Sequence, residues 1–99
     1  MIYEMSTYSF SPGGIPEFEK AFGSALLGRE GYSKMTAFWK TEIGDVNQVI
    51  YVWSYNDFQH REEICEELEN DPNWPPKYSV KQMSGRVEIL NPTPFMTPR

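Results

Sequence analysis

The stretch QVIYVWSY, residues 48–55, most restricts what this chain can fold into, because both faces of the strand it predicts carry apolar groups. Side chains of a β-strand alternate between the two faces of the sheet. Ile50 and Val52 would therefore lie on one face, and Tyr51 and Trp53 on the other. One layer of helices can cover only one face of a sheet. We therefore expect a second layer over the other face.

Six secondary-structure elements are predicted, in the order strand, helix, strand, strand, helix, strand. The strands cover residues 2–10, 34–43, 48–55 and 82–89, and the helices begin at Ile15 and Phe58. In both helices apolar residues recur at helical spacing; in the second these are Phe58, Ile64, Cys65 and Leu68, which we expect to point inward. Right-handed crossovers in a βαββαβ chain place both helices on one face of a four-stranded antiparallel sheet. The expected fold is α+β and ferredoxin-like, one domain over residues 1–99 with a proline-rich tail at 91–99.

The strand phases also predict which residues occupy the helix-free face, the side of the sheet that the helices leave uncovered. Tyr51 and Trp53 are assigned to it. Soluble monomers rarely expose an apolar patch of several hundred Å², which is roughly the size these rings would leave uncovered. A second copy of the chain would cover the patch if the two sheets packed face to face around a two-fold axis. We therefore expect a homodimer, paired through the helix-free face.

The helix-free face is also predicted to carry many ionisable groups. The residues assigned to it are Glu4, Ser6, Tyr8, Phe38, Lys40, Glu42, Tyr51, Trp53, Arg86 and Glu88. Because an unpaired buried charge is costly, two interpretations remain open: a small-molecule pocket, or an ion-paired and partly solvated dimer interface. For a pocket we expect a small, mainly apolar or aromatic ligand between the sheets, and the candidate binding residues are Tyr8, Lys40, Glu42, Tyr51, Trp53 and Arg86.

Composition excludes several classes of partner. The formal net charge is −5 and there is no basic run, which argues against nucleic acid or an anionic membrane. No apolar run approaches the roughly 20 residues of a membrane span, so no membrane insertion is expected. The single Cys65 cannot form an intramolecular disulfide, and the first ten residues lack the pattern of a signal peptide. A cytoplasmic location is therefore expected.

Few residues offer catalytic or metal chemistry. His60 is the only histidine and is a weak catalytic candidate, but its place in a charged helix favours a surface role. Cys65 lies in the apolar register of that helix, where a small buried side chain is the usual role. The glutamates between residues 62 and 69 lack histidine partners and are interpreted as a solvated face. No metal site and no cofactor are predicted; haem, the most testable cofactor, would have only His60 as a histidine ligand.

Three segments together form a specific pattern: AFWKTEIGDVNQVIYVWSYNDFQHR at residues 37–61, IYEMSTYSF near the start and ILNPTPF near the end. In these segments, which cover most of the chain, the sequence resembles the NIPSNAP family of the dimeric α+β barrel superfamily. The resemblance implies a ferredoxin-like protomer that pairs into a barrel. The family has no agreed catalytic residues, so the resemblance implies a fold more readily than a reaction.

The chain departs from the family pattern at three positions. Ser6 and Asn91 stand where the family commonly has Arg, and Tyr51 stands where it commonly has His. Each exchange removes a basic or titratable group, so a site of the family that depended on those charges is not expected here. We expect a NIPSNAP-like homodimer that acts through assembly or by binding a small apolar or aromatic ligand between the sheets. The alternative, by analogy with the superfamily, is a small cofactor-independent monooxygenase, isomerase or haem-degrading enzyme.

Overall fold

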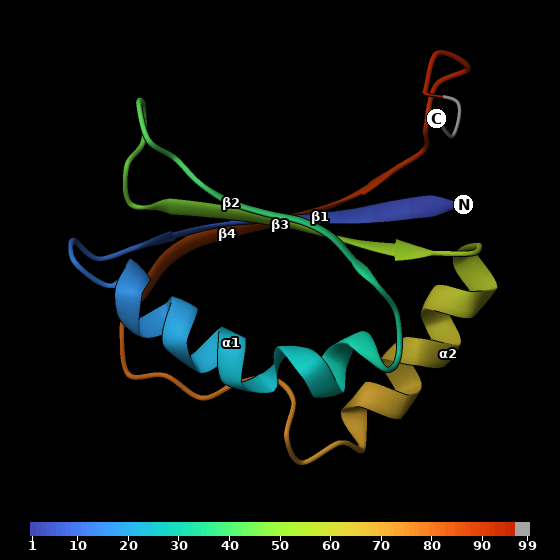
Figure 1. Cartoon of the computed structure of the whole chain (residues 1–99), viewed down its shortest axis with the longest axis horizontal. Helices are drawn as coiled ribbons and strands as arrows, with labels where there is room; N and C mark the ends of the chain where they lie inside the picture. The colour runs from blue at the N-terminus through green and yellow to red at the C-terminus, as the bar shows by residue number, and fades with distance from the viewer. Residues whose placement is uncertain (97–99) are drawn as a thin grey trace.

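The computed structural model describes residues 1–96 and contains the six expected elements (Figure 1). They are β1 (Ile2–Phe10), α1 (Ile15–Glu30), β2 (Met35–Lys40), β3 (Gln48–Tyr55), α2 (Phe58–Glu69) and β4 (Gln82–Leu90). β2 is shorter than predicted, because the ladder with β3 ends at the pair Lys40 and Val49. Residues 41–47 form the connection instead, with Gly44 at a positive φ of 122°. The tail predicted at 91–99 is described as far as Met96.

The sheet order is β2-β3-β1-β4, and every neighbouring pair is antiparallel. Figure 1 shows α1 and α2 on the same side of the sheet, and within residues 1–96 no helix lies on the other side. The α+β, ferredoxin-like fold class is therefore confirmed. Within residues 1–96 no helix has the length and apolar character needed to cross a bilayer.

The prediction that Tyr51 and Trp53 lie on the helix-free face is wrong. The rings of Tyr51 and Trp53 lie 4.9 and 6.0 Å from the ring of Phe22 in α1, and the two side chains are only 9% and 2% exposed. The register pairs Ser6 with Tyr51 and Glu4 with Trp53, so β1 turns the same phase toward the helices. Large rings fill the space between sheet and helix, where they interdigitate with the phenylalanines of α1.

The helix-free face is instead formed by the other phase of each strand. Thr7 is paired with Ile50 in β3 and with Arg86 in β4, so these three side chains share that face. Arg86 and Glu88 lie there as expected and form an ion pair at 3.0 Å, but they lie on the opposite face from Tyr8, Tyr51 and Trp53. The predicted group of ten residues is therefore split between the two faces.

The two helices pack unequally. Ile15, Phe18 and Phe22 of α1 are buried on the sheet, and Pro16 lies in the first turn, where its missing N–H is tolerated. In α2 only Ile64 is fully buried. The prediction that Phe58 points inward is wrong: its side chain is 56% exposed, because it is the first residue of α2 and lies beyond the edge of the core.

Candidate functional site

A cavity of about 580 Å³ lies between the helix-covered face of the sheet, the two helices and the segment that joins α2 to β4. β1 and β3 form its floor through Glu4, Ser6, Tyr8, Tyr51 and Trp53, and α1 contributes Phe18, Phe22 and Arg29. The connecting segment, residues 70–81, adds Trp74 and Tyr78. We call this space the aromatic pocket.

Ring contacts fix the walls of the aromatic pocket. The Tyr8 ring lies 5.8 Å from Tyr51 across the sheet, and the Trp74 ring meets Trp53 edge to face at 6.0 Å. Burial raises the pKa of the Tyr51 phenol, and burial followed by the nearby Tyr8 raises that of Tyr78. These phenols are therefore neutral near pH 7 and offer hydroxyl groups and ring faces to a ligand.

The 70–81 segment is held over the pocket by side chains at both ends. The Tyr32 hydroxyl donates to the Asp71 carboxylate at 2.8 Å. At the other end, the backbone N–H and hydroxyl of Ser79 both donate to Glu17 in the first turn of α1. These contacts tie the segment to α1 and to the turn after it, so Trp74 and Tyr78 are placed as pocket walls.

Arg29 is a buried cation in the wall of the pocket. Its side chain is 3% exposed, and its guanidinium carbon lies 4.0 Å from the centroid of the Trp53 ring. One terminal nitrogen donates to the Ser33 hydroxyl at 2.9 Å and the other to the Tyr55 hydroxyl at 2.8 Å. The Nε–H group is buried and has no acceptor in the described part of the chain.

Sequence analysis did not identify Arg29, although a signal for it exists. Ile15, Phe22 and Arg29 are each seven residues apart, which places all three on the stripe of α1 that faces the sheet. A charged residue that continues a buried stripe is a candidate functional residue, because burying its charge carries a desolvation penalty that an apolar residue at that position would avoid.

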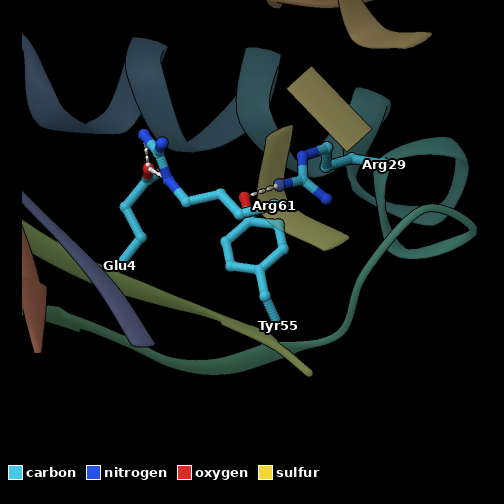
Figure 2. A network of polar contacts seen from close by, with 4 residues as sticks. All are labelled: Glu4, Arg29, Tyr55 and Arg61. Atoms are coloured by element: carbon cyan, nitrogen blue, oxygen red, sulfur yellow. Dashed lines mark hydrogen bonds and ion pairs between the residues drawn. The ribbon is translucent and has the colours of Figure 1, made fainter. Parts of the chain in front are cut away.

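A second arginine in the pocket is fully paired. Arg61 of α2 donates from Nε to the Glu4 carboxylate at 2.7 Å and also contacts it through Nη2 at 2.5 Å. Figure 2 shows this pair beside the Arg29–Tyr55 contact. Burial, followed by the Glu4 charge, raises the pKa of Tyr55. The pocket thus contains one neutralised ion pair and one cation without a carboxylate partner among residues 1–96.

The structure brings together three of the predicted ligand-binding residues. Tyr8, Tyr51 and Trp53 line the aromatic pocket, on the helix-covered face. Lys40 forms an ion pair with Glu19 of α1 at 3.6 Å, and Glu42 lies in the 41–47 connection. Lys40 and Glu42 line a separate hollow at that end of the sheet. Arg86 lies on the helix-free face.

His60 has a structural contact outside the pocket lining. Its backbone N–H donates to the Asp57 carboxylate at 2.7 Å, which caps α2. Its Nδ1 atom accepts the Asn56 N–H at 2.9 Å, so the ring completes a reciprocal cap at the start of the helix. Cys65, by contrast, lines the pocket and is half-buried. Within residues 1–96 no group of three or more His, Cys, Asp or Glu residues is arranged to hold a metal ion.

The fold and the pocket define the class: a small ferredoxin-like α+β protein with an aromatic pocket between its helices and its sheet. The NIPSNAP family model matches residues 3–97, and the chain belongs to the NIPSNAP family. The resemblance identified from the sequence is confirmed.

Individual relatives agree with this assignment. The chain is 29% identical over 98 residues to the mouse protein NipSnap homolog 3B, covering 94% of this chain and 40% of that protein. It therefore spans less than half the length of the curated relatives it matches. A crystal structure of an uncharacterized NIPSNAP domain protein from Burkholderia xenovorans matches with a TM-score of 0.84 and 29% identity, covering 99% of this chain and 100% of that one.

A more distant solved structure shares only the fold. The crystal structure of an antibiotic biosynthesis monooxygenase matches with a TM-score of 0.65 and 12% identity, covering 95% of this chain and all of that chain. At this identity the likeness carries no residue roles.

Proposed function

We propose that this protein binds a small, mainly aromatic molecule in the aromatic pocket. The observation that carries the proposal is the cavity of about 580 Å³ walled by the rings of Tyr8, Tyr51, Trp53, Trp74 and Tyr78. Small-molecule sites commonly measure about 300–1,000 Å³ and combine apolar walls with a few convergent polar groups. The phenols and Arg29 supply those polar groups. The expected location is thus the helix-covered face of one protomer, in place of the space between two sheets.

The three tryptophans of the chain provide a direct test. Trp53 and Trp74 line the pocket, whereas Trp39 is paired with Ile50 on the other face. Titration of ¹⁵N-labelled protein with aromatic acids, quinones and phenols should shift the indole N–H signals of Trp53 and Trp74 and leave that of Trp39 unchanged. Trp74→Ala should weaken binding at least tenfold, and Trp39→Ala should not. Hits that shift only Trp39, or no hit in the whole panel, would exclude the pocket.

We also propose that two copies pair through the helix-free face. That face carries Met5, Ile50 and the 57% exposed Trp39, and neither of the two helices described for residues 1–96 covers it. Figure 1 shows the 41–47 connection and the tail after β4 both leaving the sheet on this side. Each carries exposed apolar residues, among them Ile43 and Phe95. A second sheet packed on this face would bury these groups, whereas water would otherwise surround them.

An enzymatic role is the second candidate. It is supported by the fold shared with the antibiotic biosynthesis monooxygenase, which is support at the level of architecture alone. Aerobic incubation of the protein with phenols that bind the pocket, followed by mass spectrometry, tests it. Products that have gained oxygen relative to the added phenol, and that form only with the wild-type pocket, would favour the enzyme. Unchanged phenol after many hours would favour a binding protein.

A further inference from the structure

We propose that the pocket selects an aromatic carboxylate, whose anionic group pairs with Arg29. This inference rests on the proposed function, since it names the class of molecule that the aromatic pocket takes. The chemistry is ionic recognition at one end of the ligand and ring contact over the rest.

The charges around the pocket support an anion. Arg61 already has the Glu4 carboxylate, which also accepts from its Nε atom. Arg29 has only neutral partners, the hydroxyl groups of Ser33 and Tyr55 and the Ser33 carbonyl oxygen. Glu69 lines the pocket but lies exposed at the end of α2 and forms no ion pair with Arg29. Arg29 is therefore the one lining cation without a counter-ion among residues 1–96.

The contact with Trp53 does not replace a counter-ion. Buried charges in proteins are nearly always paired, because the desolvation penalty is several times larger than an ordinary cation–π attraction. Trp53 at 4.0 Å and Trp74 at 5.7 Å stabilise the guanidinium and hold its plane in place. They leave its positive charge uncompensated.

The unused donor gives the direction of the missing partner. Nε–H of Arg29 has no acceptor among residues 1–96, while the hydrogen bonds to Ser33 and Tyr55 fix both terminal nitrogens. A carboxylate forms charge-assisted hydrogen bonds to a guanidinium held in this way. Trp74 belongs to the 70–81 segment, and we expect a shift of its ring to open Nε to the ligand. The rings beside Arg29 would then contact the aromatic body of the same molecule.

The test compares isosteric ligands on the 99-residue chain. We use 2-naphthoate, the neutral 2-naphthamide and the cationic 2-naphthamidine, and measure dissociation constants by calorimetry. A charged hydrogen bond gained in a buried site predicts that naphthoate binds about 10- to 100-fold more tightly than naphthamide. Naphthamidine should bind least. In Arg29→Gln the ratio of naphthoate to naphthamide affinity should fall to within about twofold.

Arg86→Gln is the matched control, because it removes the same charge from the helix-free face. It should keep the wild-type preference. Equal binding of naphthoate and naphthamide to the wild-type protein, or an Arg29→Gln variant that stays folded and keeps the preference, would overturn the inference and leave the aromatic pocket intact. If neither ligand shifts the indole signals of Trp53 and Trp74, the inference fails, and the proposed function fails with it only if no compound of the wider panel shifts those signals. Should Arg29→Gln not fold, tighter binding of naphthamidine than naphthoate to the wild type would still reject the inference.

Discussion

The guanidinium of Arg29 lies over the Trp53 ring, 4.0 Å from its centroid, and joins the last turn of α1 to β3. Trp53 also lies 6.0 Å from Phe22, so one side of its ring belongs to the core. The same indole lines the aromatic pocket. If the pocket binds a ligand as proposed, variants at Trp53 are expected to affect both stability and ligand recognition.

Trp53→Ala should strongly destabilise the protein. Truncating a buried large aromatic residue commonly costs about 3–5 kcal/mol, and this variant also removes the ring beneath Arg29. Urea denaturation should show a lower midpoint, and a ligand titration should show weaker binding. Phe58→Ala is the control, because that ring is largely exposed and its loss should change the free energy of unfolding by less than about 1 kcal/mol. Equal losses in the two variants would contradict the packing described here.

Gly85→Ala should disturb a wall of the aromatic pocket. Gly85 lies opposite Tyr8 in the β1–β4 ladder, and an added Cβ would lie 2.5 Å from atoms of the Tyr8 ring. The ring must then move toward the pocket. We expect weaker binding of any pocket ligand, by about tenfold if the displaced ring costs about 1.4 kcal/mol. Gly23→Ala, whose added Cβ would meet open space, should leave binding unchanged.

The contact between Glu17 and Ser79 predicts a pH dependence of the 70–81 segment. The Ser79 hydroxyl, and then its backbone N–H, hold the pKa of Glu17 below its ordinary value of 4.5. Because the folded-state pKa is the lower one, the stabilisation is present above pH 4.5 and is lost as the pH falls through the lowered pKa.

This dependence can be measured at a single group. An NMR titration of the Glu17 carboxyl should give a pKa that moves upward in Ser79→Ala, because the largest cause of the shift is removed. Ser24→Ala, on the same helix but bonded to the Lys20 carbonyl, should leave the Glu17 pKa in place. An unchanged Glu17 pKa in Ser79→Ala would show that the segment is not fastened by this contact.

His60 is expected to stabilise α2 and not to take part in catalysis or binding. His60→Ala should change ligand affinity by less than about twofold, since the ring does not line the pocket. Asp57→Ala should lower stability by about 0.5–2 kcal/mol through loss of the cap. If an activity is found, a hundredfold loss in a folded His60→Ala protein would refute this assignment.

A homodimer is expected in solution. Light scattering at micromolar concentration should give twice the 11.5 kDa mass of one chain. Ile50→Lys places a charge in the middle of the helix-free face and should shift the population to monomer. Leu27→Lys, at an exposed position of α1, should not. A wild-type protein found only at 11.5 kDa would reject the dimer.

Much of the fold could be read from local patterns. The apolar residues of α1 repeat at helical spacing, and β-branched and aromatic residues mark β1 and β3, so the order of the elements could be predicted. The resemblance of three segments then identified the family. The candidate site could be predicted in part: Tyr8, Tyr51 and Trp53 do share one face and one pocket. Alternation within β3 groups Tyr51 with Trp53, and the β1–β3 register adds Tyr8 to the same face.

The sequence by itself determined the elements, because these depend on spacing between near neighbours. It also determined the antiparallel sheet, through the connection rule for a βαββαβ chain, and the membership of the NIPSNAP family, through the residues of three segments. Alternation sorts a strand into two sets of side chains but does not say which set faces the helices. Only the tertiary structure decided that Tyr51 and Trp53 pack on Phe22, and that Arg29 reaches Tyr55, a residue 26 positions away. Those choices depend on how each element is rotated when side chains from distant parts of the chain fill one core.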